Sequence, residues 1–207
     1  MSRERTKIAV LVSGGGTNLQ ALIDAQKDGI ITSGEIVLVV SSNPDAYALT
    51  RAEQNGIPHV VVSKKACGSG EAFEAQLCKI LEENGIELII LAGFMTILSE
   101  SFTKKYQRRI LNVHPSLIPS FCGAGFYGLY VHEAALSYGV KVTGATVHFV
   151  NEIPDGGEII MQRAVEILEG DTPSILQKRV MEQAEWKILP LSAEKISKEI
   201  QDSKTER

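Results

Sequence analysis

The chain has 207 residues, of which 44% are hydrophobic and 22% are charged, and its formal net charge is −4. This length and composition are typical of one globular domain with a sizeable core. The acidic balance argues against general nucleic-acid binding, which normally requires a basic surface. One basic cluster, formed by Lys104, Lys105, Arg108 and Arg109, is interpreted as the solvated face of a helix.

The spacing of cysteines and histidines argues against a metal site. Cysteine usage and the length of the apolar runs indicate the compartment. Cys67, Cys78 and Cys122 form no Cys-x-x-Cys pair, and no Cys/His group has the spacing of zinc ligands. We therefore expect reduced thiols and no metal ion. The sequence shows no signal-peptide pattern and no apolar run long enough to cross a bilayer. These features predict a cytoplasmic protein without a membrane partner.

Short apolar runs alternate with amphipathic segments as far as Val113. Continuous apolar strands separated by helices predict a mostly parallel sheet with helices on both faces. The periodicity predicts strands at 7–12, 35–40, 59–62, 87–91 and 109–113, and helices at 17–27, 46–55 and 71–84.

The pattern changes in the second half of the chain. A helix at 129–138 precedes two predicted strands at 142–150 and 158–165, and a final helix is expected at 173–189. The Gly156-Gly157 turn favours antiparallel pairing of these two strands at one edge of the sheet. Residues 201–207 are polar, and we expect them to fray. The chain therefore reads as a single α/β domain over 1–207, with its core at about 7–195.

A glycine-rich turn, Ser13–Asn18, follows the first predicted strand and begins the first helix. Ligands of open α/β sheets bind at the carboxyl ends of the strands. The predicted strands place this turn at the same edge of the sheet as residues 41–44, 92–98 and 112–119. Glycines permit close backbone approach to a phosphate, and a helix N-terminus favours an anion. The turn lacks both the Walker A lysine and the third small residue of the dinucleotide fingerprint. It indicates a phosphomonoester rather than NAD, although such a turn is often only a tight connection.

Asn112, His114 and Asp155 could converge on one carbonyl carbon. An amide can donate a hydrogen bond to a developing oxyanion, and an imidazole can move protons near neutral pH. A carboxylate can hold and polarise the imidazole. Pro115 disfavours the helical region for the preceding residue, so His114 is expected in extended backbone at a strand end.

Five ordered motifs resemble those of glycinamide ribonucleotide formyltransferase. They lie at 13–18, 91–95, 112–119, 144–150 and 155–157, and the resemblance covers about residues 7–195. It implies a Rossmann-like nucleotide-binding fold. The implied reaction moves the formyl group of 10-formyltetrahydrofolate, a co-substrate, to the amine of glycinamide ribonucleotide in purine (IMP) biosynthesis. It also implies small-molecule partners, no tightly bound cofactor and no nucleic acid, and it allows a homodimer.

The resemblance assigns residues to three sites. The catalytic residues are Asn112, His114 and Asp155; the nucleotide would contact Gly15, Gly16, Thr17, Asn18, Pro115 and Glu185; the folate would contact Met95, Thr96, Ile97, Leu98, Asn112, Asn151, Glu152, Ile153, Pro154 and Asp155. Asn112 and a protonated His114 would stabilise the oxyanion formed when the amine attacks. Asp155 would keep His114 cationic and, through an ordered water, help carry a proton to the departing folate nitrogen.

The chain departs from the family pattern at three places. Thr96 replaces a common arginine, and the stretch 121–128 is longer than in the shorter members. Glu185-Trp186 stands where a Glu-His pair is usual, after an apparent one-residue insertion.

Several alternatives compete with these assignments. We interpret His59 and His132 as structural and Cys122 as non-catalytic. His148 alternates with Thr146 and could face the active-site side, but a structural role is favoured over a catalytic one. Methionyl-tRNA formyltransferase shares the trio but carries a C-terminal RNA-binding domain, for which this chain has no room. Formyltetrahydrofolate hydrolase usually has an N-terminal regulatory domain and a second histidine in place of Pro115. A non-catalytic nucleotide sensor would not require the trio.

Overall fold

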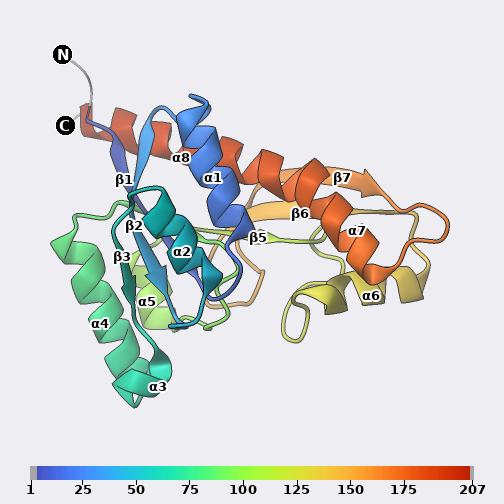
Figure 1. Cartoon of the computed structure of the whole chain (residues 1–207), viewed down its shortest axis with the longest axis horizontal. Helices are drawn as coiled ribbons and strands as arrows, with labels where there is room; N and C mark the ends of the chain where they lie inside the picture. The colour runs from blue at the N-terminus through green and yellow to red at the C-terminus, as the bar shows by residue number, and fades with distance from the viewer. Residues whose placement is uncertain (1–3, 206–207) are drawn as a thin grey trace.

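A seven-stranded sheet crosses the computed structural model, which describes residues 4–205 (Figure 1). The strand order is β3-β2-β1-β4-β5-β6-β7, parallel from β3 to β5 and antiparallel from β5 to β7. This arrangement confirms the predicted α/β fold and its antiparallel edge. The strands are β1 Thr6–Val12, β2 Gly34–Ser41, β3 His59–Val61, β4 Leu88–Leu91, β5 Ile110–His114, β6 Val142–Phe149 and β7 Ile159–Glu166.

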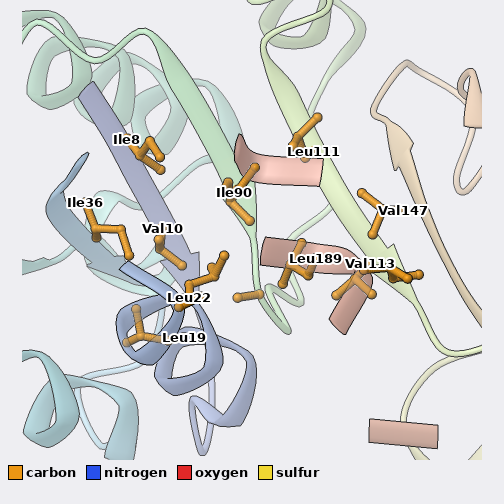
Figure 2. Packing of buried hydrophobic residues seen from close by; sticks show 14 of the residues in the cluster. Ile8, Val10, Leu19, Leu22, Ile36, Ile90, Leu111, Val113, Val147 and Leu189 are labelled. Atoms are coloured by element: carbon orange, nitrogen blue, oxygen red, sulfur yellow. The ribbon is translucent and has the colours of Figure 1, made fainter. Parts of the chain in front are cut away.

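Helices cover both faces of the sheet, and alternate residues of β1 show how the faces divide. Ile8 and Val10 pack with Leu22 of α1 and Leu189 of α8 (Figure 2), whereas Leu11 packs in a second cluster with helices α4 and α5. Strand residues point alternately to opposite faces of the sheet, so β1 contributes side chains to both clusters. Both clusters are buried. The helices are α1 Thr17–Lys27, α2 Tyr47–Gln54, α3 Lys64–Cys67, α4 Gly70–Glu83, α5 Glu100–Lys105, α6 Leu129–Tyr138, α7 Pro173–Val180 and α8 Trp186–Thr205, with a π-helical turn, η1, at Met181–Glu185.

The expected basic helix face is only half present. Lys104 and Lys105 end α5, but Arg108 has a left-handed backbone (φ 57°) and lies with Arg109 beyond the helix. The short helix α3 was not expected; Ser63 caps it by accepting a hydrogen bond from the backbone N–H of Ala66.

The final helix is longer than the periodicity predicted. It was expected to end at residue 189, before Pro190, and residues 201–207 were expected to fray. Instead, α8 contains Pro190 and continues to Thr205, because Ala193, Ile196 and Ile200 extend its buried stripe. The expectation of fraying was therefore wrong for residues 201–205, whereas 206 and 207 lie outside the described residues.

Between residues 4 and 205, none of the helices combines the length and the apolar character that a bilayer crossing requires.

Candidate active site

The glycine turn, the end of β2 and the segment after β4 meet at the carboxyl edge of the parallel strands. The Ser13 hydroxyl lies 2.6 Å from the Ser42 hydroxyl and accepts a hydrogen bond of 2.9 Å from the Met95 backbone N–H. These contacts bring three of the four expected segments together at this edge of the sheet, as strand order predicts.

Two glycines of the turn serve different purposes. Gly16 has a φ of 73°, and a Cβ added there would lie 2.7 Å from Ala48 Cβ, so this position requires glycine for local packing. Gly15 is exposed, and an added Cβ would meet nothing within 4 Å. No side chain caps the α1 N-terminus that follows. The N-terminal N–H groups of α1 are therefore available to an anion that approaches over Gly15.

Glu185 lies beside this turn. Its side chain is 6% exposed and accepts a hydrogen bond of 2.7 Å from Asn18 Nδ2. Glu185 ends the π-helical turn η1, whose first residue, Met181, accepts a long contact from Thr17 Oγ1. A π-turn accommodates one extra residue inside a helix, which explains how the apparent insertion leaves Glu185 at the turn. Burial raises the pKa of Glu185 to about 7, although the Asn18 hydrogen bond lowers it in part.

Asn112 and His114 project from the same face of β5. Leu111 and Val113 alternate with them and pack in the opposite cluster, toward α1 and α8. Asp155 reaches the pair from the loop after β6, with a left-handed backbone (φ 56°). Its carboxylate oxygens lie 3.5 Å from Asn112 Nδ2 and 3.4 Å from His114 Nδ1. The structure therefore brings the three predicted catalytic side chains together.

Backbone groups of the loop after Pro119 hold two members of this trio. The Phe121 carbonyl oxygen lies 2.8 Å from His114 Nε2, and the Gly123 N–H donates to Asp155 Oδ2 at 2.8 Å. A carbonyl oxygen only accepts, so His114 Nε2 carries a hydrogen and Nδ1 faces Asp155. Sequence reasoning missed these contacts, because a backbone group has no residue signature.

The pKa of His114 is lowered, in contrast to the expectation that Asp155 keeps the ring cationic. Burial lowers the pKa of His114, while Asp155 and the Phe121 carbonyl raise it only in part. Burial would also raise the pKa of Asp155, but His148, His114 and the Gly123 N–H together lower it below its usual value. These directions favour an ionised Asp155, and a neutral His114 can accept a proton at Nδ1.

The two loops expected to surround the folate follow β4 and β6, and the second of them contains Asp155. Met95, Ile97 and Ile153 are exposed apolar side chains, and Ile97 is 79% exposed. Leu98 differs, because its side chain lies in the buried cluster with Phe102. The remaining predicted residues of these loops are at least partly accessible, namely Thr96, Asn151, Glu152 and Pro154.

The other histidines lie in three different settings. His59 is exposed on the edge strand β3, and His132 is buried on α6 with neither ring nitrogen hydrogen-bonded to a described residue. Burial, together with a smaller contribution from nearby His114, lowers the pKa of His132 to about 4. His148 is buried opposite Asn112, which the linear pattern did not reveal.

Comparison with known proteins places the chain among enzymes that carry a formyl transferase domain. The sequence profile described as Formyl transferase matches residues 6–192. The chain is 42% identical to phosphoribosylglycinamide formyltransferase of Haemophilus influenzae, over 89% of this chain and 84% of that protein. It is 47% identical to the trifunctional purine biosynthetic protein adenosine-3 of Gallus gallus, over 93% of this chain. That alignment spans only 18% of the longer chicken protein.

A solved structure agrees with these sequence relatives. The chain superposes on glycinamide ribonucleotide transformylase 1 from Symbiobacterium toebii with a TM-score of 0.87 and 40% sequence identity. The superposition covers 94% of this chain and 89% of the other.

Proposed function

The chain belongs to the formyl transferase family, and from this premise we propose that it is a phosphoribosylglycinamide formyltransferase. It transfers the formyl group of 10-formyltetrahydrofolate to the amine of glycinamide ribonucleotide, which gives formylglycinamide ribonucleotide. The observation that carries this proposal is the convergence of Asn112, His114 and Asp155 at the end of β5, on the edge of the sheet that also carries the glycine turn. Residues 1–207 constitute a single formyltransferase domain in this proposal.

The crevice offers a separate place for each substrate. The N-terminus of α1 beside Gly15 suits the phosphate of the nucleotide, and the Asn18–Glu185 pair supplies polar groups for its ribosyl part. The exposed apolar side chains Met95, Ile97 and Ile153 suit the folate. Asp155, in the second folate loop, contacts both Asn112 and His114, so the formyl carbon of a folate bound there would lie at the trio.

The reaction begins when the amine nitrogen attacks the formyl carbon and the carbonyl oxygen becomes an oxyanion. Asn112 Nδ2 donates a hydrogen bond to this oxyanion. His114 accepts the amine proton at Nδ1, and the resulting imidazolium is paired with ionised Asp155 at 3.4 Å. The imidazolium then donates its proton to the folate nitrogen as the bond from that nitrogen to carbon breaks. His114 thus becomes cationic during the reaction rather than before it.

The proposed setting follows from the same assignments. The substrates are two small molecules, neither a nucleic acid nor a membrane is required, and 10-formyltetrahydrofolate acts as co-substrate rather than as a bound cofactor. We place the enzyme in the cytoplasm and allow a homodimer.

One experiment tests the proposal directly. The purified protein is incubated with 10-formyltetrahydrofolate, with and without glycinamide ribonucleotide, and both products are measured. We expect folate deformylation only with the nucleotide, together with an equal amount of formylated nucleotide. Equal folate turnover without the nucleotide would favour a hydrolase instead, and absence of turnover in both arms would contradict an enzymatic role.

A further inference from the structure

His148 of β6 lies opposite Asn112 of β5, and both of its ring nitrogens have partners. The ring is 2% exposed. Its Nδ1 atom lies 2.8 Å from the carbonyl oxygen of Phe149, and its Nε2 atom lies 3.3 Å from Asn112 Nδ2. Nε2 also lies 3.5 Å from Asp155 Oδ1. One ring nitrogen therefore contacts the backbone, whereas the other faces two members of the catalytic trio.

The backbone contact selects the tautomer of this ring. The Phe149 carbonyl oxygen can only accept a hydrogen bond, so His148 Nδ1 must carry the hydrogen. In a neutral imidazole the other nitrogen then has a free lone pair. Because the Asn112 amide nitrogen is a donor, it donates to His148 Nε2 across the 3.3 Å separation.

The same contacts fix which end of the Asn112 amide faces inward. Nδ2 lies next to two acceptors, His148 Nε2 and Asp155 Oδ1. A flipped amide would place its oxygen against a lone pair and a carboxylate, which is repulsive. The amide nitrogen has two hydrogens. One is engaged by these acceptors, and the second is left for a substrate oxygen.

We propose that His148 is a positioning residue that accepts a hydrogen bond from Asn112 and so holds the amide nitrogen as the oxyanion donor. This rests on the proposed formyl-transfer function, in which Asn112 stabilises the oxyanion. The acceptor role requires an Nε2 atom without a hydrogen, because a hydrogen there would point to Asp155 Oδ1 at 3.5 Å and leave no lone pair for the Asn112 amide. The titratable groups that face the ring are Asp155 and His114.

The neighbouring backbone supports this assignment independently. A Cβ added at Gly157 would lie 1.7 Å from the Phe149 carbonyl oxygen and 3.6 Å from His148 Nδ1. The register between β6 and β7 also shifts between Val147 and His148. The close approach at Gly157 therefore packs against the carbonyl that orients the ring. Asp155 and Gly157, two residues of one short motif, thus reach opposite sides of His148.

Two substitutions distinguish a hydrogen-bond acceptor at position 148 from a ring that only fills space. His148→Phe keeps a planar ring but removes both nitrogens, whereas His148→Gln retains a side-chain oxygen that can accept from Asn112. We expect His148→Phe to lower kcat by about 10–10²-fold, less than outright loss of an oxyanion donor. The KM values for both substrates should stay within about threefold of the wild-type values, because Asn112 stabilises the transition state rather than the bound substrates in the proposed mechanism. His148→Gln should recover most of kcat, and His59→Phe, on the exposed edge strand, should match the wild type.

A double-mutant cycle tests whether His148 acts through Asn112. In an Asn112→Ala background, His148→Phe should lower kcat by less than about threefold, since no amide remains to be oriented. A full, independent loss in that background would overturn the proposal in favour of a separate role for His148.

A spectroscopic measurement on the wild type needs neither turnover nor a stable variant. ¹⁵N NMR of histidine-labelled protein at the assay pH should show His148 with a protonated Nδ1 and an unprotonated Nε2. The opposite tautomer, or a doubly protonated ring, would overturn the positioning role even if formyl transfer is observed. Conversely, the expected tautomer without formyl transfer would contradict the proposed function and leave the hydrogen-bond assignment standing.

Discussion

Glu185 accepts a hydrogen bond from Asn18 across 2.7 Å, although 167 positions separate the two residues in the chain. The contact joins the π-helical turn η1 to the first turn of α1, directly after the glycine turn. A buried carboxyl group with one amide partner is costly to ionise. The pair therefore links the charge state of Glu185 to the stability of the packing between η1 and α1.

The first prediction concerns this linkage. The pKa of Glu185 is raised from 4.5 to about 7 in the folded protein, mainly by burial. Below the pKa of the unfolded chain, Glu185 is protonated in both the folded and the unfolded state, so its burial as a charge does not reduce the free energy of unfolding. As pH rises toward 7, the folded state loses stability relative to the unfolded chain, and the full shift corresponds to about 3 kcal/mol. Glu185→Gln removes this ionisation.

Denaturant unfolding of wild type and Glu185→Gln at pH 5 and pH 8 measures the difference. The free energy of unfolding of the variant, relative to wild type, should be higher at pH 8 than at pH 5. Identical pH dependence of the two proteins would show that Glu185 ionises normally in the folded state.

The second prediction separates packing from ligand approach at the glycine turn. Gly16→Ala should destabilise the fold by about 1–2 kcal/mol or more, because it adds a Cβ in a left-handed backbone against Ala48. Gly15→Ala meets no atom within 4 Å and should leave the stability nearly unchanged. It should instead raise the KM for glycinamide ribonucleotide more than the KM for the folate, since the added methyl obstructs the phosphate.

Thermal unfolding and steady-state kinetics of the two alanine variants test this contrast. If Gly15→Ala raised only the KM for the folate, the two halves of the crevice would be assigned the wrong way round.

The parts of this structure that the linear pattern predicted are those determined by local chemistry. Continuous apolar runs such as 7–12 produce buried strands, and Pro115 leaves His114 in an extended strand end, as its φ/ψ restriction requires. The extension of α8 past Pro190 was missed because tertiary packing overrode a helix-breaking residue. The contact between His148 and Asn112 was missed because it depends on the register between β5 and β6, which is a long-range property.

The third prediction follows from the pKa of His114. Burial lowers this pKa and Asp155 raises it in part, so removing the negative charge leaves burial less opposed. Asp155→Asn should therefore lower the pKa of His114 further. NMR titration of the His114 ring in both proteins measures the change, and kcat should fall together with it. An unchanged or raised pKa of His114 in this variant would argue against the His114–Asp155 pairing.

The last prediction distinguishes the roles within the trio. Asn112→Ala removes the oxyanion donor and should lower kcat by about 10²–10³-fold. His114→Ala removes the group that carries the proton from the amine to the folate nitrogen, for which losses of about 10²–10⁴-fold are typical. Asp155 acts on the same proton transfer, because its carboxylate is paired with His114 Nδ1 at 3.4 Å.

A double variant of His114 and Asp155 should therefore lose far less than the product of the two single losses, since the second change removes a partner that no longer has a function. Equilibrium binding of glycinamide ribonucleotide should survive in each single variant, because we propose that the phosphate binds at the uncapped α1 N-terminus and not at the trio. Near-normal turnover by a folded, nucleotide-binding His114→Ala protein would show that the catalytic centre lies elsewhere.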